Sequence, residues 1–169
     1  GYSLVFRAPG AVVAVSRQMV RQLVALGCSK DKIIYNPYGV DSDKFAQASV
    51  ADSRPVFLAV GRFVGKKAPY LTILAFHEVW KQNPDVRLRM IGAGPLQHMC
   101  RTIVASLGMG NAVQFLGALG HDSVQAEMQR CRAFVQHSVQ AESGDCEGTP
   151  VAVLEAGMSG VPVVASRHA

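Results

Sequence analysis

Residues 87–117 read RLRMIGAGPLQHMCRTIVASLGMGNAVQFLG, and they predict a strand, a helix and a second strand in succession. The predicted helix carries apolar side chains at the i, i+3, i+4, i+7 spacing of an amphipathic helix, at Leu96, Met99, Cys100, Ile103, Val104 and Leu107. Gly108 supplies its C-terminal stop. Short apolar runs at Arg87–Gly92 and Val113–Gly117 flank it. Strands that alternate with helices in this way predict a parallel sheet.

The same alternation continues over most of the chain. Further apolar runs of strand length lie at Ala11–Ser16, Val56–Gly61, Ala133–Ser138 and Val161–Ser166. Helical patterns lie between the runs, and one of them is marked by Leu71, Leu74, Ala75 and Val79. We therefore expect an α/β fold, a Rossmann-like parallel sheet with helices on both faces.

Local capping signals predict where three of the helices begin. Ser16 is the expected N-cap of the first helix, and Asp122 is the expected cap of a shorter one. Thr149 and Pro150 fit the N-cap and the first helical position of the last helix, because proline has no amide hydrogen to lose there. Gly160 closes this helix, which is expected to be about ten residues long.

The composition is that of a folded globular domain. The chain has 169 residues, of which 49% are apolar and 17% charged, and its net charge is +5. A compact chain of this length buries roughly 70% of its unfolded surface, which excludes intrinsic disorder. No apolar run approaches the roughly 18 residues of a transmembrane helix. The opening GYSLVFRAPG has no signal pattern and begins with Gly1, so we expect a piece of a longer protein.

Charges and cysteines are spread along the chain. The sequence has no run of about five or six like charges, the pattern of a nucleic-acid tail or a polybasic membrane patch, so we expect no nucleic-acid partner. Cys28, Cys100, Cys131 and Cys146 show no C-x-x-C pairing and lie far apart. A chain of this size needs no disulfides, so we interpret them as reduced thiols of a cytoplasmic protein.

The pattern of strands and helices is interrupted once. Residues 36–45, NPYGVDSDKF, are rich in turn residues, and residues 46–55, AQASVADSRP, are small and polar. We therefore place an interdomain linker at residues 41–55. It separates a strand–helix–strand unit at residues 1–40 from a β–α repeat domain at residues 56–169.

The first group that could carry chemistry is GRFVGKK, Gly61 to Lys67, directly after a predicted strand. In an open parallel sheet, ligands bind beyond the carboxyl ends of the strands, so Arg62 and Lys67 would lie at the rim of the binding crevice. A guanidinium can hold two phosphoryl oxygens at once and an ammonium adds a mobile charge, a combination suited to a diphosphate. The alternative is an ordinary solvated basic loop.

The second group is IGAGP, Ile91 to Pro95, again at a strand end. It matches the start of the dinucleotide fingerprint G-x-G-x-x-G, but Gln97 stands where the last glycine is required. A tight strand-to-helix turn that lets a ligand approach the backbone is enough to explain Gly92 and Gly94.

The third group is SGDCEGTPVAVLEAGMSGVPVV, residues 143–164, where a glycine-containing loop runs into a helix. The first free amides of this helix belong to Gly148, Thr149 and Val151. Together with the helix dipole, they predict an anion site suited to phosphate.

Two glutamates flank this helix terminus. Glu147 precedes the cap, and Glu155 lies about 9 Å from the cap along the helix axis. Both would repel a phosphate, whereas both suit neighbouring sugar diols as bidentate acceptors. The alternative is a capping carboxylate and a solvated helical glutamate.

The sequence shows no metal centre and no catalytic triad. His98 and Cys100 are two residues apart on a helix and point away from each other. His121 stands alone in the pattern. The pair His137–Ser138 closes a strand, where we expect it to line the crevice, but no Asp/Glu–His–Ser set can be located.

Taken together, these motifs resemble glycosyltransferase family 4, the retaining nucleotide-sugar transferases of the two-domain GT-B fold. The resemblance rests, in chain order, on VAVSRQMVRQLVALG, KIIYNPYGVDSDKF, FLAVGRFVGKK, MIGAGP, VQFLGAL, FVQHS and EGTPVAVLEAGMSGVPVVAS. It covers nearly the whole chain from about Ala11. Its most specific part is EGTPVAVLE together with Arg62 and Lys67 at the family's spacing.

The resemblance implies a role for each candidate residue. Arg62 and Lys67 would bind the donor diphosphate and stabilise the departing nucleoside diphosphate. Glu147 would hold hydroxyls of the transferred sugar, which makes it the third catalytic residue, and Glu155 would accept from the ribose diol. The other implied donor contacts are the phosphate cradle at Gly148 and Thr149, the base-side residues Leu116, Gly117 and Ser138, and the loop glycines Gly61 and Gly92.

The implied reaction is transfer of a hexose, with retention, from a GDP- or UDP-sugar to a saccharide or lipid-linked acceptor. No cofactor and no obligatory metal are implied, and the setting is polysaccharide or glycolipid assembly in the cytoplasm. Residues 1–40 would be the last unit of the acceptor-side domain, and residues 56–169 a donor domain truncated at its C-terminus. The missing domain would bind the acceptor and make any peripheral membrane contact, so this piece alone is expected to transfer little or no sugar.

Two positions depart from the family pattern. Ala68 replaces the glycine usual after the lysine, which stiffens the turn but leaves the ammonium in place. The segment Gln136–Ser138 lacks the proline common at that strand end. Two other functions stay open at this point, a sugar-nucleotide epimerase of the same fold and a non-catalytic nucleotide-binding module. A phosphorylase would need a cofactor lysine and loops that we do not find.

Overall fold

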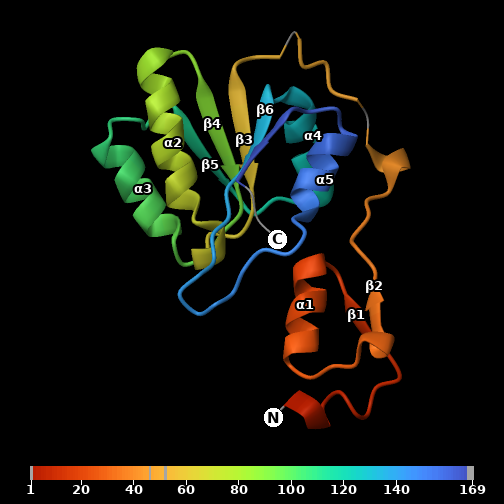
Figure 1. Cartoon of the computed structure of the whole chain (residues 1–169). Helices are drawn as coiled ribbons and strands as arrows, with labels where there is room; N and C mark the ends of the chain where they lie inside the picture. The colour runs from red at the N-terminus through yellow and green to blue at the C-terminus, as the bar shows by residue number, and fades with distance from the viewer. Residues whose placement is uncertain (1, 46, 52, 167–169) are drawn as a thin grey trace.

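The main feature of the molecule is a parallel sheet. A computed structural model describes residues 2–45, 47–51 and 53–166 (Figure 1). Over these residues the chain forms a five-stranded sheet in the order β5-β4-β3-β6-β7, and every neighbouring pair is parallel. Its strands are β3 (Val56–Val60), β4 (Arg87–Ile91), β5 (Val113–Gly117), β6 (Ala133–Gln136) and β7 (Val163–Ala165). The expected Rossmann-like sheet is confirmed.

Helices cover both faces of this sheet, as the sequence predicts (Figure 1). They are α2 (Pro69–Gln82) and α3 (Gln97–Ser106) on one face, and α4 (His121–Arg130) and α5 (Val151–Met158) on the other. Leu88 and Met90 of β4 belong to the core under α2 and α3. Leu58 and Phe134 belong to the core under α4 and α5. None of the described helices is both long enough and apolar enough to cross a membrane.

The N-terminal part of the chain forms a second, two-stranded sheet. In it β1 (Val12–Ala14) pairs in parallel with β2 (Ile33–Tyr35), and α1 (Arg17–Ala25) connects the two strands. The hydroxyl of Ser16 accepts a hydrogen bond from the amide of Met19, so the first predicted N-cap is confirmed. The predicted domain boundaries around the linker stay a prediction. Single turns of 3-10 helix lie at Tyr2–Leu4, Lys30–Lys32, Ser42–Lys44 and Gly65–Lys67.

The two other predicted helix starts are wrong. Asp122 does not cap α4, because that helix starts one residue before it and Asp122 lies within the first turn. Thr149 does not cap α5 either: its hydroxyl donates to the carbonyl of Val15 at 3.2 Å, and the helix starts two residues later. A tertiary partner 134 residues away thus replaces the local capping bond. As a result α5 has 8 residues.

The loops that follow β3 and β4 are interlocked by close backbone contacts. The amide of Gly61 donates to the carbonyl of Ile91 at 2.9 Å. Gly92 has a φ of +133°, and a Cβ there would overlap the carbonyl group of Gly61. Gly94 has a φ of +155°, and its Cβ would lie 2.5 Å from the carbonyl oxygen of Phe63. These glycines therefore admit the neighbouring loop, and the predicted role of Gly92 as a donor contact stays a prediction.

We expect Gly92→Ala to destabilise the protein by about 3 kcal/mol or more, because the added methyl group forces backbone to move at a φ that L-residues rarely adopt. Urea unfolding measures the loss. Gly110→Ala is the matched control: no described atom lies within 4 Å of a Cβ at that position, so its effect should stay within about 0.5 kcal/mol. Equal losses of unfolding free energy in the two variants would contradict the close packing of the two loops at Gly92.

All four cysteines are free thiols. Cys28, Cys100 and Cys131 are buried, and Cys146 is half-buried in the loop before α5. Burial raises the pKa of Cys100 to about 11. Burial also raises the pKa of Cys131 to about 11, with a smaller contribution from the nearby carboxylate of Glu127. Neither thiol is expected to react readily near neutral pH, because the thiolate is the nucleophile.

At pH 8 a thiol reagent such as DTNB should therefore modify about one thiol per chain quickly, that of Cys146. The buried thiols should react only as fast as the protein unfolds, and all four should react in urea. The absorbance of the released thiolate gives both phases. Cys146→Ser should abolish the fast phase, and a fast phase that persists in this variant would show that a buried thiol is accessible.

Candidate functional site

An ion pair joins the two most specific motifs of the sequence. Lys67 lies in the short helical turn after β3, and Glu147 lies in the loop between β6 and α5. The Nζ atom of Lys67 is 2.6 Å from Oε2 of Glu147, and the two side chains are only 17% and 13% exposed. The aliphatic part of Lys67 passes over Gly61, where a Cβ would lie 3.6 Å from Cε of the lysine. The sheet thus brings a predicted phosphate-binding cation against a predicted sugar-binding carboxylate.

A second, more exposed ion pair fastens the same two loops. Nζ of Lys66 is 3.2 Å from Oδ1 of Asp145, whose side chain is 58% exposed. The backbone adds a further link, because the amide of Val139 donates to the carbonyl of Lys66 at 2.8 Å. The β6–α5 loop is therefore held against the β3–α2 loop at three points.

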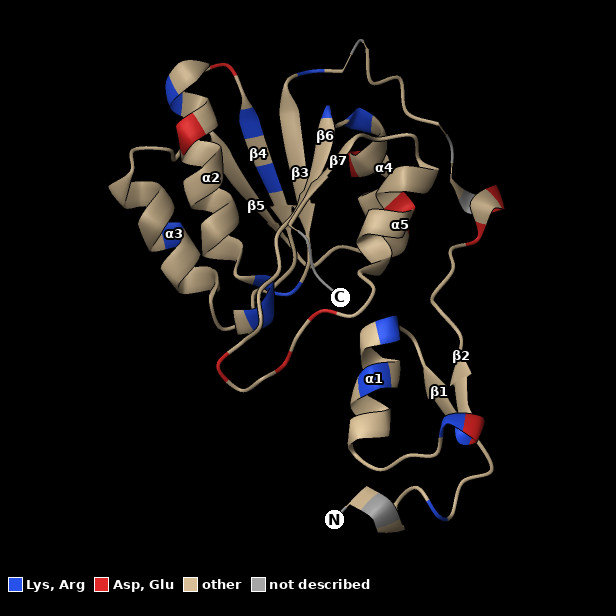
Figure 2. Cartoon of the chain, in the orientation of Figure 1, with Lys and Arg blue, Asp and Glu red and all other residues tan. Residues whose placement is uncertain are grey.

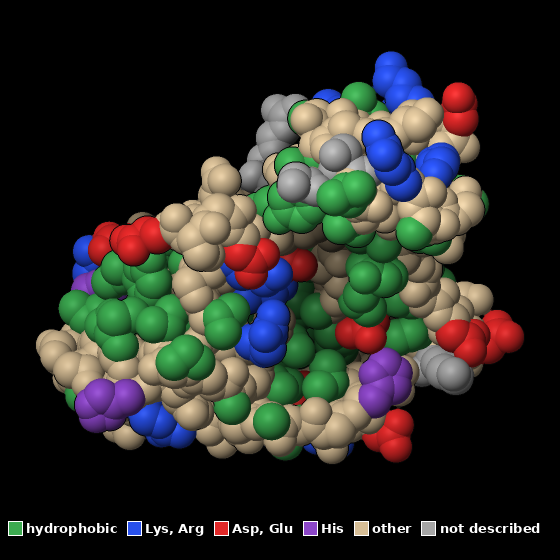
Figure 3. All heavy atoms as spheres, turned by 90° about the horizontal axis from the view of Figure 1, so that it is seen from below, with side chains coloured by type: hydrophobic (Ala, Val, Ile, Leu, Met, Phe, Trp, Pro, Cys, Tyr) green, Lys and Arg blue, Asp and Glu red, His purple; other side chains and the backbone are tan. Residues whose placement is uncertain are grey.

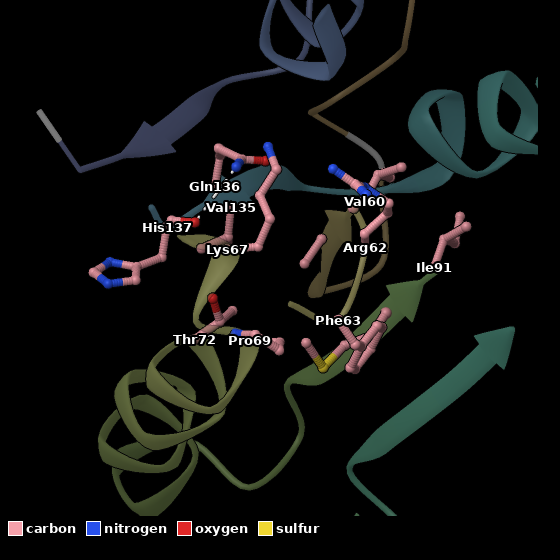
Figure 4. A pocket seen from close by; sticks show the side chains of 13 residues that line it. Val60, Arg62, Phe63, Lys67, Pro69, Thr72, Ile91, Val135, Gln136 and His137 are labelled. Carbon is pink, nitrogen blue, oxygen red and sulfur yellow. Dashed lines mark hydrogen bonds between the residues drawn. The ribbon is translucent and has the colours of Figure 1, made fainter. Parts of the chain in front are cut away.

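Arg62 and Lys67 line one small cavity (Figure 4). Its volume is about 30 Å³, enough for a water molecule and far too small for a nucleotide, so a ligand would lie outside it, on the rim. His137 also lines this small cavity, and the expectation that His137 and Ser138 line the ligand crevice stays a prediction. The side chain of Arg62 is exposed and has no hydrogen-bond or ion-pair partner in the described part of the chain. Its guanidinium is therefore available to a ligand.

The start of α5 lies directly after Glu147 in the chain. The amides of Gly148, Thr149 and Val151 donate no hydrogen bond to any of the described residues. Their position before and in the first turn of α5 gives them the positive end of the helix dipole. The predicted anion site is thus next to the Lys67–Glu147 ion pair.

Glu155 lies further along α5 and is 15% exposed. Its Oε1 atom is 3.8 Å from Nδ1 of His121 at the start of α4. The other ring nitrogen of His121 is 3.2 Å from Nε2 of Gln125. The interpretation of His121 as an isolated residue is therefore wrong, because α4 and α5 lie side by side and bring it to Glu155.

The surface at the carboxyl ends of the strands is hollowed. Figure 3 shows this face: Lys, Arg and acidic side chains lie on one flank of the hollow, an acidic side chain beside a histidine lies on the other, and hydrophobic side chains lie between them. Near the site, Lys67 forms an ion pair with Glu147, and the ring of His121 contacts the carboxylate of Glu155. The arrangement offers cationic and carboxylate groups to one ligand.

The remaining predicted donor contacts are part of the fold at the same edge. Ser138 is buried, its amide donates to the hydroxyl of Ser166 at 3.0 Å, and its hydroxyl accepts from Nε2 of Gln136 at 3.1 Å. Leu116 packs on the core under α4 and α5. The carbonyl of Gly117, next to it, accepts from the amide of Gly92 at 2.7 Å. These groups lie at the site, and their roles as base contacts stay predictions.

The N-terminal unit also contacts the site, through residues that no sequence motif predicts. The hydroxyl of Thr149 donates to the carbonyl of Val15, and Nε2 of Gln18 lies 3.6 Å from Sγ of Cys146. The loop that carries Glu147 is therefore held between the two units of the chain.

Comparison with known proteins accounts for this combination of fold and site. The chain matches the family Glycosyl transferases group 1 over residues 40–169. It belongs to this family. The resemblance to GT-B glycosyltransferases is thereby confirmed, and the epimerase and non-catalytic alternatives are not favoured.

The chain is similar to glycosyltransferases along nearly its whole length. It is 30% identical over 169 residues to WcaL of Escherichia coli strain K12, named as a colanic acid biosynthesis glycosyltransferase, and covers 42% of WcaL with 99% of its own length. It is 30% identical over 142 residues to a GDP-mannose-dependent α-(1-6)-phosphatidylinositol monomannoside mannosyltransferase of Mycolicibacterium smegmatis, with 78% of this chain and 37% of that protein covered.

The fold is shared with the crystal structure of Anabaena Alr3699/HepE in complex with UDP-glucose. The TM-score is 0.79 at 20% identity, and the match covers 96% of this chain and 46% of that one. The chain thus spans less than half the length of each of these three proteins.

Breaking the Lys67–Glu147 ion pair should destabilise the protein measurably. Glu147→Gln leaves a largely buried ammonium with a neutral partner, and we expect a loss of about 1–3 kcal/mol in urea unfolding. Asp145→Asn, two residues earlier in the same loop, removes the exposed partner of Lys66 and should cost less than about 0.5 kcal/mol. Similar losses in both variants would contradict the difference in burial on which this prediction depends.

Proposed function

We propose that this chain is the donor-binding part of a retaining glycosyltransferase that transfers a hexose from a GDP- or UDP-sugar. The observation that best supports the proposal is the Lys67–Glu147 ion pair, at 2.6 Å. It joins a cation suited to a diphosphate and a carboxylate suited to sugar hydroxyls at the edge of the sheet where α/β proteins bind ligands.

The donor diphosphate would lie between Arg62, Lys67 and the first amides of α5. A lysine ammonium has three donors, so Lys67 can keep Glu147 and still donate to a phosphoryl oxygen. The unpaired guanidinium of Arg62 can hold two oxygens at once. When the sugar leaves, negative charge builds on the diphosphate, and donors aimed at such charge are worth about 10²–10³ in rate each. Arg62 and Lys67 would therefore act in catalysis as well as in binding.

The two glutamates would hold hydroxyl groups on either side of the diphosphate. Glu147, already oriented by Lys67, would accept from hydroxyls of the transferred sugar. Glu155 follows the first residue of α5 by about 6 Å along the helix axis, and it would accept from the ribose diol. His121 contacts one of its oxygens at 3.8 Å and leaves the other for this bond.

We propose that transfer needs no bound metal ion and no cofactor. Two side-chain cations and the positive end of α5 provide positive charge at the position where a divalent ion would otherwise neutralise the leaving group. Retention of configuration is the expectation from the resemblance to family 4. Proton NMR of the anomeric signal in the product of the full-length enzyme tests it.

The acceptor we propose is a saccharide or a lipid-linked saccharide. The relatives named for colanic acid and for a phosphatidylinositol monomannoside support these two classes. Because the chain covers 42% of WcaL, we propose that it binds donor and transfers little or no sugar by itself, and that any peripheral membrane contact is made elsewhere in the enzyme. The free cysteines support a cytoplasmic location.

Binding of nucleoside diphosphates tests the site directly. A ligand at about 100 times its Kd stabilises a protein by about 2.7 kcal/mol, so UDP or GDP should raise the melting temperature by several degrees. Arg62→Ala and Glu155→Ala should each weaken binding about tenfold, because each removes a charged hydrogen-bonding partner. Differential scanning fluorimetry over a series of nucleotide concentrations gives the Kd values.

Arg7→Ala is the control, because Arg7 is exposed and lies before β1 in the N-terminal unit. It should leave the nucleotide shift unchanged. Full retention of the shift in both Arg62→Ala and Glu155→Ala would overturn the assignment of the site.

A further inference from the structure

A second recess lies at the opposite edge of the main sheet, where the strands begin. It is bounded by the starts of β3, β4 and β5, the end of α4 and the linker before β3, and its volume is about 970 Å³. We call it the amino-edge recess. A recess of this size can hold an oligosaccharide or another ligand of that size. The loops that carry Lys67 and Glu147 follow the carboxyl ends of the strands, so the two sites are at opposite ends of the sheet.

The amino-edge recess is strongly basic. Its charged side chains, among the described residues that line it, are Arg54, Arg87, Arg89 and Arg130 and a single carboxylate, Asp85. Figure 2 shows Lys and Arg segments gathered at the amino ends of β4 and β6 and in the linker before β3. One of the arginines, Arg89, is paired with Glu127 at 2.6 Å. The side chains of Arg54 and Arg130 are exposed and have no ion-pair partner within the described part of the chain.

Two of these arginines stand where a parallel sheet normally carries apolar residues. β4 lies between β3 and β5, and interior strands of parallel sheets are buried on both faces. Arg87 and Arg89 are two residues apart and therefore share one face, the face covered by α4, because Arg89 reaches Glu127 of that helix. The guanidinium of Arg87 donates to the carbonyls of Pro84 and Val86, both at 2.8 Å, which fixes its orientation. Core packing alone does not favour guanidinium groups at these positions.

The uncharged part of the lining is suited to sugars. Asn111, Gln114 and Gln129 are exposed, and their amides can both donate to and accept from hydroxyl groups. Of the apolar residues of the lining, Leu88, Ala112 and Val113 are buried, Val56 is half-buried and Pro55 is exposed. One exposed proline offers little apolar surface to a bilayer, so a lipid surface is the weaker fit.

We propose that the amino-edge recess binds an acidic oligosaccharide, a chain of sugars that carries carboxylate or phosphate groups. The arginines would hold the acidic groups in bidentate fashion, and the side-chain amides would hold the hydroxyls. This site is separate from the donor site, and it requires neither Arg62 nor Glu147. An enzyme with both sites would bind a growing or finished polysaccharide at one end of the domain and the activated sugar at the other.

Calorimetric titration of the chain with tetragalacturonate, a carboxylated probe, tests the proposal, with maltotetraose as the neutral probe. We expect saturable binding of tetragalacturonate alone. The double variant Arg54→Gln/Arg130→Gln should weaken it about tenfold or more, since each lost bidentate pair removes a charge-assisted contact. Arg7→Gln/Arg21→Gln makes the same change in net charge at exposed positions of the N-terminal unit, and it should alter the Kd by less than about twofold. If the double variant fails to fold, the two single variants replace it, each expected to weaken binding about threefold.

Four outcomes would overturn the proposal: no binding of tetragalacturonate, equal binding of maltotetraose, equal losses in the two double variants, or binding of anionic phosphatidylglycerol vesicles in place of the oligosaccharide. The melting-temperature shift with UDP should be unchanged in Arg54→Gln/Arg130→Gln. This readout separates the two sites, because a failed donor site removes the UDP shift from the unmodified chain and leaves tetragalacturonate binding intact.

Discussion

The candidate site depends on backbone hydrogen bonds that continue beyond the ends of three neighbouring strands. After β3, the amide of Phe63 donates to the carbonyl of Ala93 at 3.0 Å, and the carbonyl of Phe63 accepts from the amide of Leu96 at 3.0 Å. The amide of Gly92 donates to the carbonyl of Gly117 at 2.7 Å. The loops after β3 and β4 and the last residue of β5 are thereby tied to one another. Arg62 extends from this base, so little backbone freedom is lost when its guanidinium meets a ligand.

The loop that carries Glu147 completes the site and is held from two sides. Its ion pair with Lys67 joins it to the main sheet, and the bond from Thr149 to Val15 joins it to the N-terminal unit. A displacement of one unit against the other therefore has to break or stretch one of these bonds. The position of Glu147 is sensitive to the arrangement of both units.

The sequence predicts those features that depend on residues close together in the chain. Apolar periodicity identifies the strands and helices of the main sheet, and the cap at Ser16 is predictable because its partner is three residues away. The predicted helix cap at Thr149 is wrong because the hydrogen-bond partner of its hydroxyl lies 134 residues away in the chain. The carboxyl edge of the sheet is predictable as the meeting point of Lys67 and Glu147, but their direct contact is not. Arg87 and Arg89 place two charges on one face of an interior strand, a signal of the amino-edge recess that belongs to none of the sequence motifs. The roles of the individual donor-site residues stay predictions.

The interlocked turns after β3 and β4 constrain how this protein can be engineered. Gly92 and Gly94 leave room for the neighbouring main chain only because they lack a Cβ. A chimaera that exchanged the GRFVGKK segment alone would pack a new loop against the unchanged IGAGP loop. The close backbone contacts between these two loops leave no space for a change in the path of either one. A variant with a changed ligand preference is therefore best made by grafting both segments, GRFVGKK and IGAGP, together from one parent protein.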